Sequence, residues 1–281
     1  LRNSKRGGDE SDATPDPPYT SSRPHRSARM PVDRNAPFYN MKHKYRGLAF
    51  IFNHEHFDNK LLNSRTGTNV DSEKLSKVLK NLGFEVTVLV DLTSDDIDKR
   101  LQKLSGPKMD HTDFDCLLIA VLTHGEQGRL YAKDTHYRPD NLWDFFTGDK
   151  CPTLAGKPKL FFIQACQGDT LDGHRSKRSC SETDGTPTPS YKIPVHADIL
   201  IVYSTVPGYY SWRNTNRGSW FVEALCEELR RTDRDILTLL TFVCQRVALD
   251  FDSYTLDQVP MDQKKQVPCI TSMLTRRLVF D

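Results

Sequence analysis

The chain has 281 residues, of which 37% are hydrophobic, and its formal net charge at pH 7 is +2. This length allows one sizeable core, the near-neutral charge gives no general attraction to nucleic acid or to an anionic membrane, and no apolar run is long enough to span a membrane. The seven cysteines include no C-x-x-C pair, which argues against a disulfide framework or a zinc site and favours a soluble, cytoplasmic protein with free thiols.

Residues 1–44 differ in composition from the rest of the chain. They contain six prolines and many polar residues, with only scattered apolar side chains. Such a segment cannot bury enough apolar surface to offset the loss of chain entropy on folding. We therefore predict a disordered N-terminal arm that precedes the folded domain.

From residue 45 onward, the pattern alternates between short buried runs, which are typical of strands, and amphipathic helical spacing. In chain order we predict a strand at 48–53, a helix at 70–82, a strand at 84–90, a helix from its cap at Ser94 to 105, a strand at 115–123, a helical stretch at 140–147, a strand in the run 159–168, a strand at 197–205, helices at 219–230 and 236–251, and a last strand at 277–280. Strands that alternate with helices favour a mainly parallel sheet. The expected fold is an α/β three-layer sandwich with a six-stranded, mainly parallel sheet.

Residues 169–190 interrupt this pattern. They are rich in Gly, Ser, Thr and Pro, and Leu171 is their only large aliphatic residue. We interpret them as an exposed linker. The linker divides one folded domain into a larger part at 45–168 and a smaller part at 191–281.

Two of the predicted strands end in reactive side chains. His124 follows the strand at 115–123, and Cys166 lies near the end of the run 159–168. Because the carboxyl ends of parallel strands meet at one edge of a sheet, the thiol and the imidazole are expected to lie close together. A neighbouring imidazole favours the reactive thiolate. Taken singly, a cysteine in such a run is more often a small core side chain, and a lone histidine is more often a turn residue.

Five sequence strings carry a resemblance to a known family. They are Lys-His-Lys-Tyr-Arg-Gly at 42–47, Ser-Arg-Thr-Gly-Thr-Asn-Val-Asp at 64–71, Leu-Thr-His-Gly-Glu at 122–126, Gln-Ala-Cys-Gln-Gly at 164–168 and Pro-Gly-Tyr-Tyr-Ser-Trp-Arg-Asn at 207–214. With these strings in family order, residues 40–280 resemble a caspase, and more closely an insect executioner caspase. The resemblance implies the caspase fold and a cysteine endopeptidase that cleaves proteins after aspartate and needs neither a cofactor nor a metal.

In the implied mechanism, the thiolate of Cys166 attacks the scissile carbonyl and His124 acts as the acid and base. The backbone N–H groups of Gly125 and Cys166 would hold the oxyanion. The sequence offers no candidate for a third member of the catalytic set.

The resemblance also assigns the substrate-binding residues. Arg65 and Arg213, with Gln164 beside them, are expected to hold the aspartate carboxylate through paired charge-assisted hydrogen bonds. Without the motifs, either arginine would be read as a surface residue and the aromatic cluster as core. The remaining residues expected to line the substrate cleft are Tyr210, Ser211, Trp212, Asn214 and Trp220.

Activation from a zymogen is a further implication. Asp12 in the arm and Asp184 in the linker each follow a glutamate by two residues and precede a small residue, as expected of caspase processing sites. No death-fold domain precedes the catalytic part of this sequence, which favours an executioner over an initiator. The implied partners are proteins with Asp-Glu-x-Asp-like sites, an upstream initiator caspase, caspase inhibitor proteins, and a second large and small subunit pair. This homodimer would form through the last strand, at an apolar edge made by Met273, Leu274, Leu278 and Val279.

Two alternatives from other classes compete with this interpretation. One is a non-catalytic protein, either a caspase-like regulatory scaffold or an α/β binding domain. The sequence has no phosphate-binding glycine motif to support nucleotide binding, and the intact cysteine, histidine and arginines argue against a scaffold. The other alternative is a peptidase that selects Arg or Lys, which would need acidic residues at positions 65 and 213.

Overall fold

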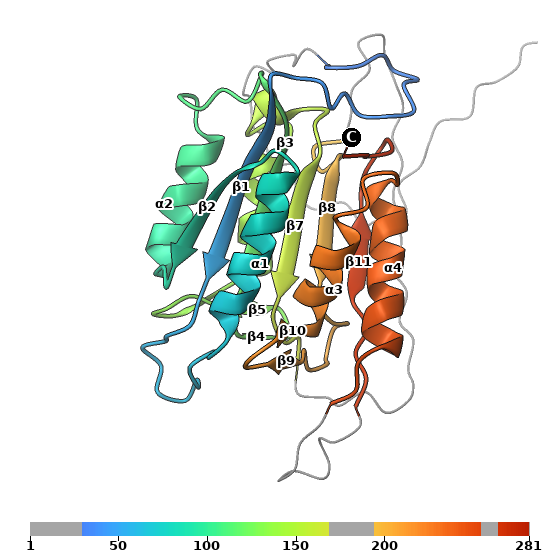
Figure 1. Cartoon of the computed structure of the whole chain (residues 1–281). Coiled ribbons are helices and arrows are strands. Elements are labelled where there is room, and N and C mark those ends of the chain that lie inside the picture. Colours follow the sequence, from blue (N-terminus) through green and yellow to red (C-terminus); the bar gives the residue numbers. More distant parts are fainter. Residues whose placement is uncertain (1–29, 169–193, 254–263, 281) are drawn as a thin grey trace, which may run out of the picture.

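The computed structural model describes residues 30–168, 194–253 and 264–280. Its centre is a six-stranded sheet in the order β11-β8-β7-β3-β1-β2 (Figure 1). Five of these strands pair in parallel, and β11 pairs antiparallel with β8. Their bounds are β1 Tyr45–Asn53, β2 Glu85–Val90, β3 Phe114–Leu122, β7 Lys159–Gln164, β8 Ile199–Tyr203 and β11 Cys269–Ser272. The predicted α/β sandwich with a six-stranded, mainly parallel sheet is confirmed.

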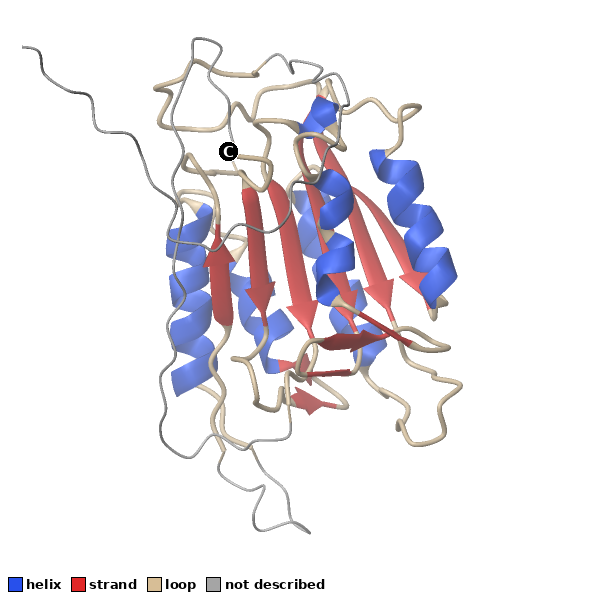
Figure 2. Cartoon of the chain, turned by 180° about the vertical axis from the view of Figure 1, so that it is seen from behind, coloured by secondary structure: helices blue, strands red, loops and turns tan. Residues whose placement is uncertain are grey.

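Helices cover the sheet on both faces (Figures 1 and 2). One apolar core lies between the sheet and α1, α3 and α4, and the other lies between the sheet, α2 and three short 3-10 helices. The bounds are α1 Thr68–Asn81, α2 Ser94–Ser105, α3 Trp220–Glu228, α4 Ile236–Leu249, η1 Pro139–Leu142, η2 Asp144–Phe146 and η3 Pro152–Leu154. None of the helices in the described part of the chain is long and apolar enough to cross a membrane.

The central strands are buried on both faces. Successive residues of β3 alternate between the two cores, with Leu118 and Ala120 on one side and Leu117 and Ile119 on the other. Burial of each large aliphatic side chain stabilises the fold by about 1.5–3 kcal/mol. β3 and β7 pair so that Leu122 lies opposite Gln164, and the two strands therefore end at the same level.

Two short sheets extend beyond the carboxyl ends of the central strands. One is formed by β4 Gly125–Glu126, β5 Arg129–Tyr131 and β6 His136–Tyr137, and the other by β9 Arg213–Asn214 and β10 Gly218–Ser219. They follow directly from β3 and from the loop after β8, so they surround the edge at which β3 and β7 end.

Most elements begin or end a few residues away from their predicted bounds, and the helical segments at 94–105 and 140–147 differ in detail. The helical stretch predicted at 140–147 consists of two short 3-10 helices, η1 and η2. The cap of α2 is Thr93, whose Oγ1 accepts a hydrogen bond from the backbone N–H of Asp96 at 3.2 Å, whereas we predicted Ser94. Ser94 is the first helical residue because its neighbour already satisfies a free N–H group of the first turn.

The prediction for the last strand is wrong. The sixth strand of the sheet is β11, and residues 277 and 279 form only isolated bridges, to Phe38 and Asp235. Leu278 is completely buried in the core of its own chain. The apolar edge proposed from residues 273–279 therefore does not exist as predicted, because one of its members is already covered; β11 is the strand at this edge of the sheet.

Residues 30–44, which the sequence places in the arm, pack against the domain. Tyr39 is buried, its hydroxyl donates to Oδ1 of Asp198 at 2.6 Å, and its backbone N–H donates to the carbonyl of Arg277 at 3.1 Å. The part of the arm before residue 30, the linker, and the predicted cleavage sites Asp12 and Asp184 lie outside the described residues.

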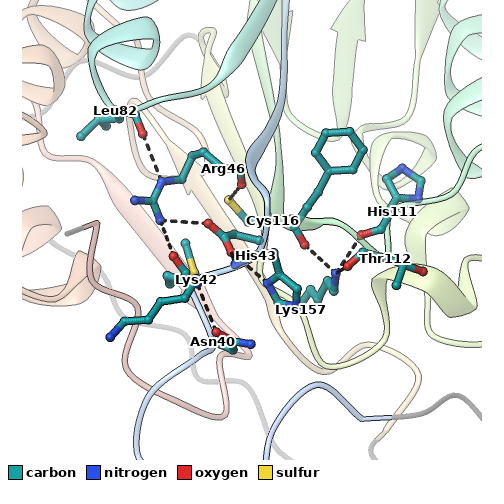
Figure 3. Close-up of polar contacts among 12 residues, drawn as sticks. Asn40, Lys42, His43, Arg46, Leu82, His111, Thr112, Cys116 and Lys157 are labelled. Atoms are coloured by element: carbon teal, nitrogen blue, oxygen red, sulfur yellow. Dashed lines mark hydrogen bonds and ion pairs between the residues drawn. The ribbon is translucent and has the colours of Figure 1, made fainter.

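The amino end of the sheet holds a compact group of paired charges (Figure 3). The buried Asp115 accepts from the ring Nδ1 and the backbone N–H of His43 at 2.9 and 2.8 Å through Oδ1, and from Nη1 of Arg46 at 3.1 Å through Oδ2. Both carboxylate oxygens therefore have charged or polar partners, as a buried charge requires.

A buried ammonium group lies beside this cluster. Nζ of Lys157 donates to the backbone carbonyls of His111 and Thr112, each at 2.7 Å, and of Phe114 at 2.5 Å. An ammonium group has three donors, and all three have acceptors. The charges of Asp115 and Lys157 are therefore both satisfied by hydrogen bonds within the chain.

Candidate active site

The two predicted catalytic side chains lie at the same edge of the sheet. The pairing of Leu122 with Gln164 places His124 two residues beyond the end of β3 and Cys166 two residues beyond the end of β7. The backbone N–H of Thr123 also donates to the carbonyl of Gln164 at 3.0 Å. The parallel sheet thus brings together residues that lie far apart in the sequence.

His124 is oriented by a backbone carbonyl. Its Nε2 lies 2.7 Å from the carbonyl oxygen of Asn63, and its ring lies 5.0 Å, between centroids, from the ring of Phe57. A carbonyl only accepts hydrogen bonds, so Nε2 carries the proton and Nδ1 of the neutral ring keeps its lone pair. The sequence did not reveal this partner of His124, because a backbone carbonyl is present at every residue.

The sulfur of Cys166 contacts the backbone of Ser211. The N–H of Ser211 lies 3.4 Å from Sγ, and Sγ lies 3.7 Å from the carbonyl oxygen of Ser211. Within the described residues, no hydrogen bond joins Cys166 and His124. The resting thiol is therefore turned toward Ser211.

Burial sets the protonation of both catalytic groups. It raises the pKa of Cys166, against a smaller lowering by the N–H of Ser211 and by the charges of Arg65 and Arg213. Burial likewise lowers the pKa of His124, and the carbonyl of Asn63 opposes that shift. At neutral pH the resting site holds a thiol and a neutral imidazole, so the thiolate forms only when a proton moves to the imidazole.

Gly125 lies against the backbone of the Cys166 segment. A Cβ at this position would lie 2.5 Å from the carbonyl oxygen of Cys166 and 3.0 Å from the Cβ of Ala165. No side chain fits in this space, which explains glycine here on steric grounds. The close approach also places the predicted oxyanion donors, the N–H groups of Gly125 and Cys166, on adjoining segments.

Arg65 is a buried cation with neutral partners. It is 2% exposed, and its Nη1 donates to the carbonyl of His54 at 3.0 Å and to Oγ1 of Thr68 at 2.7 Å. Burial, and then the neighbouring charge of Arg213, lower its pKa to about 9. The guanidinium still carries its charge at neutral pH and forms no ion pair with a carboxylate of the described chain.

Arg213 and Gln164 border the same space. Arg213 lies in β9 and donates through Nη1 to the carbonyl of Thr66, and burial lowers its pKa. Nε2 of Gln164 donates to Oγ of Ser211 at 2.8 Å, whereas its buried Oε1 has no hydrogen-bond partner in the described structure. Two cations and an unpaired amide oxygen therefore lie near Cys166, and neither cation forms an ion pair with a carboxylate of the described residues.

Asp71 is a buried acid to which the sequence assigned no role. Its Oδ1 accepts from the backbone N–H of Ser219 at 2.8 Å, and no partner is recorded for Oδ2 within the described residues. Burial raises its pKa, and the charges of Arg65 and Arg213 lower it. It lies in the motif 64–71, but only the fold brings its charge close to the two arginines.

The predicted aromatic residues form a row. The ring centroids of Tyr210 and Trp212 lie 6.5 Å apart, Trp212 stacks on Trp220 at 5.8 Å, and Trp220 stacks on Phe251 at 5.5 Å. Trp220 is buried in the core, while Tyr210 and Trp212 are partly exposed. The N–H of Trp212 donates to Oε1 of the buried Gln266 at 2.7 Å, a support that the sequence did not indicate.

Asn214 has a local structural role in the resting chain. Its Oδ1 accepts from the N–H groups of Asn216 and Arg217 at 2.9 and 3.0 Å, which closes the turn between β9 and β10. The substrate contacts expected of Asn214 and Ser211 stay predictions.

Cys166 also lines a cavity of about 200 Å3. The side chains at its wall include both charge signs, so it is a polar space next to the nucleophile. Its lining includes Glu126, Arg129, Arg138, Asp140, Gln167 and Tyr203.

Nowhere in the described part of the chain do three His, Cys, Asp or Glu residues gather closely enough to hold a metal ion.

Comparison with known proteins gives concordant matches. A family model described as "Caspase domain" matches residues 46–279. Caspase-1 of Spodoptera frugiperda is 70% identical over 276 residues, covering 98% of this chain and 91% of that protein. Caspase drICE of Drosophila melanogaster is 61% identical over 256 residues, covering 90% of this chain and 75% of that protein.

Among solved structures, the crystal structure of Caspase-1 from Spodoptera frugiperda matches with a TM-score of 0.84 and 70% identity, covering 91% of this chain and 97% of that one. The structure of pro-sf-caspase-1 matches with a TM-score of 0.71 and 72% identity, covering 91% of this chain and 98% of that one.

Proposed function

This chain belongs to the caspase family of cysteine proteases, and from that premise we propose that it cuts proteins after aspartate, with Cys166 as nucleophile and His124 as acid and base. Its similarity to the insect effector caspases makes it a protease of apoptosis. The observation that carries the proposal is the buried Arg65, which lies near Arg213 and Cys166 and has only neutral hydrogen-bond partners.

The charge of this space supports selection of aspartate. A substrate carboxylate would neutralise charge that the folded chain leaves uncompensated, and a guanidinium can hold both of its oxygens. Glutamate is one methylene longer and would move the scissile carbonyl away from Cys166. Asparagine would leave the buried arginine charge without a counter-charge.

The proposed reaction starts when substrate displaces the thiol from Ser211. The thiol proton moves to Nδ1 of His124, the sulfur bonds to the carbonyl carbon, and the oxyanion forms at the N–H groups of Gly125 and Cys166. The C–N bond then breaks, and the leaving amine takes the proton from Nδ1. Water hydrolyses the remaining thioester, with His124 as base, and returns the thiol. The carbonyl of Asn63 holds the imidazole in this tautomer throughout.

Processing and assembly follow from family membership and extend the proposal. Its substrates are proteins, as for other caspases, and we assign Asp184 and Asp12 as the processing sites. A homodimer would form at β11, the strand at the open edge of the sheet, in place of the predicted strand at 277–280. The cysteines that the structure describes are all free, which supports the cytoplasm as the compartment.

One experiment tests this proposal. Wild type and Cys166→Ala are incubated with four reporter peptides that differ only in the residue before the cut, namely Asp, Glu, Asn or Arg. We expect turnover of the Asp peptide alone, and only by wild type. Equal turnover by both forms would remove Cys166 from the mechanism, and a preference for another peptide would remove the specificity assignment.

The processing sites have a separate test. On a gel, Asp184→Ala should block the division of the chain into two large fragments. Continued division at the same point would reject Asp184 as the site.

A further inference from the structure

A chain of four hydrogen bonds leads away from Arg65. Nη1 of Arg65 donates to Oγ1 of Thr68, Thr68 donates to Oδ1 of Asn53, Nδ2 of Asn53 donates to Oδ1 of Asn69, and Nδ2 of Asn69 donates to Oε2 of Glu55. Each donor-to-acceptor distance is 2.7 Å. A cation that faces the substrate is thus linked through three neutral side chains to a carboxylate at the other end.

The two end residues, Arg65 and Glu55, allow only one donor-to-acceptor direction along this hydrogen-bond chain. A guanidinium only donates hydrogen bonds, and a carboxylate only accepts them. The single hydroxyl proton of Thr68 must therefore point to Asn53, and both asparagine amides must turn their NH2 groups toward Glu55. If Glu55 were a donor, two donors would face each other at one link, and that link would open.

The polar groups at the inner end of the hydrogen-bond chain cannot replace their hydrogen-bond partners by water. Arg65 is 2% exposed, and Asn53 and Thr68 are completely buried. A broken link there would leave a buried polar group unpaired, and the arginine would have to shift to find another acceptor. The orientation of Arg65 is therefore sensitive to what happens at the outer, partly exposed end.

Glu55 is itself held in place. Its N–H donates to Oδ1 of Asp91 at 2.7 Å, and its carbonyl accepts from the backbone N–H of Arg65 at 2.9 Å. Asp91 adopts a left-handed backbone conformation, with φ at 48°, which is costly for a residue other than glycine. Glu55 is thus connected to Arg65 twice, through its backbone and through its carboxylate.

We propose that Glu55 is a positioning residue for cleavage after aspartate, because its carboxylate anchors the hydrogen-bond chain that holds the guanidinium of Arg65 toward the substrate. This inference rests on the proposed function and names a residue that never touches the substrate. The negative charge of Glu55 also supports the charged form of both arginines, which adds an electrostatic contribution of the same sign.

Three variants separate the effect of hydrogen-bond direction from the effect of the charge at residue 55. Glu55→Lys replaces the acceptor by a donor, and we expect kcat/KM for the Asp peptide to fall about three- to tenfold, mainly through KM, as for the loss of one hydrogen bond. Glu55→Gln keeps an acceptor of the same length and should stay within about twofold of wild type.

The double variant Glu55→Lys/Asn69→Asp restores the direction of every link, because the new carboxylate accepts both from Asn53 and from the new lysine. It should recover most of the activity that Glu55→Lys loses. Glu85→Lys, with the same charge change at the exposed start of β2 at the other end of the sheet, is the matched control and should behave as wild type.

All forms are compared as full chains, with the extent of chain cleavage matched on a gel and the midpoint of thermal unfolding recorded. Wild-type activity from Glu55→Lys, or equal losses from Gln and Lys, would overturn the role of the directed chain. A double variant no better than Glu55→Lys would overturn it as well. A wild-type enzyme without a preference for Asp would contradict the proposed function itself. This outcome is distinct from those that contradict the role of Glu55.

Discussion

Buried charged side chains at the two ends of the central sheet differ in their hydrogen-bond partners. At the amino end, both oxygens of Asp115 have partners, and Lys157 donates to three carbonyls. At the carboxyl end, Arg65 has no carboxylate partner, and Oε1 of Gln164 has no recorded partner in the described structure. Asp115 and Lys157 thus have their partners in the resting chain, whereas we expect an incoming anion to supply the partner of Arg65.

Because of this difference in partners, we expect the charged residues at one end to contribute to stability and those at the other end to activity. A buried charge without a counter-charge costs folding free energy and is retained where a ligand supplies the missing partner. Substitutions at the carboxyl end should therefore reduce activity more than stability. Substitutions at the amino end should do the reverse, because their partners belong to the same folded chain.

The largest expected effect is on activity, at Arg65. Arg65→Met should lower kcat/KM for Asp peptides about 10²- to 10³-fold, the effect of removing one partner of a buried charge pair. Its unfolding free energy should stay equal or rise, because the uncompensated charge is gone. Peptide kinetics and urea unfolding measure the two quantities, with the exposed Arg231→Met as control. A large loss of stability with unchanged kcat/KM would contradict the comparison.

At the amino end, Asp115→Ala should lower the unfolding free energy by about 3 kcal/mol, because His43 and Arg46 lose their shared counter-charge. The kcat of the molecules that remain folded should not change. Urea unfolding and active-site titration test this, with the exposed Asp113→Ala as a control expected to stay within about 0.5 kcal/mol of wild type. A fall in kcat without loss of stability would place Asp115 in the catalytic machinery.

The smallest expected effect concerns pH. His54, completely buried behind Arg65, and His111, at the amino end, each have a pKa lowered by burial from 6.5 to about 4. Above pH 6.5 both imidazoles are mainly neutral in the folded and in the unfolded chain. As the pH falls from 6.5 toward 4, the imidazoles become protonated in the unfolded chain but stay neutral in the folded chain. Each histidine should therefore lower stability by about 1 kcal/mol between pH 7 and 5.5.

Replacing one histidine tests this contribution. His54→Asn and His111→Asn should each make the unfolding free energy less dependent on pH over this range, whatever their stability at pH 7. Urea midpoints across the range provide the measurement. An unchanged pH slope in either variant would show that the replaced ring binds protons equally in the folded and unfolded chains, so that burial does not lower its pKa.

The sequence alone determined the order of the five parallel strands and of the helices, the mainly parallel sheet, the candidate site residues Cys166, His124, Arg65 and Arg213, and the family. These follow from short-range periodicity and from side chains grouped in short motifs, which are visible without coordinates. The confirmed strands include those with continuous apolar runs, such as β3 and β7.

Only the tertiary structure decided the rest. The carbonyl of Asn63, the packing of residues 30–44, the position of β11 and the burial of Leu278 depend on contacts between distant segments or on backbone atoms that every residue has. The same holds for the chain from Arg65 to Glu55, because its direction depends on which polar groups meet once the fold excludes water.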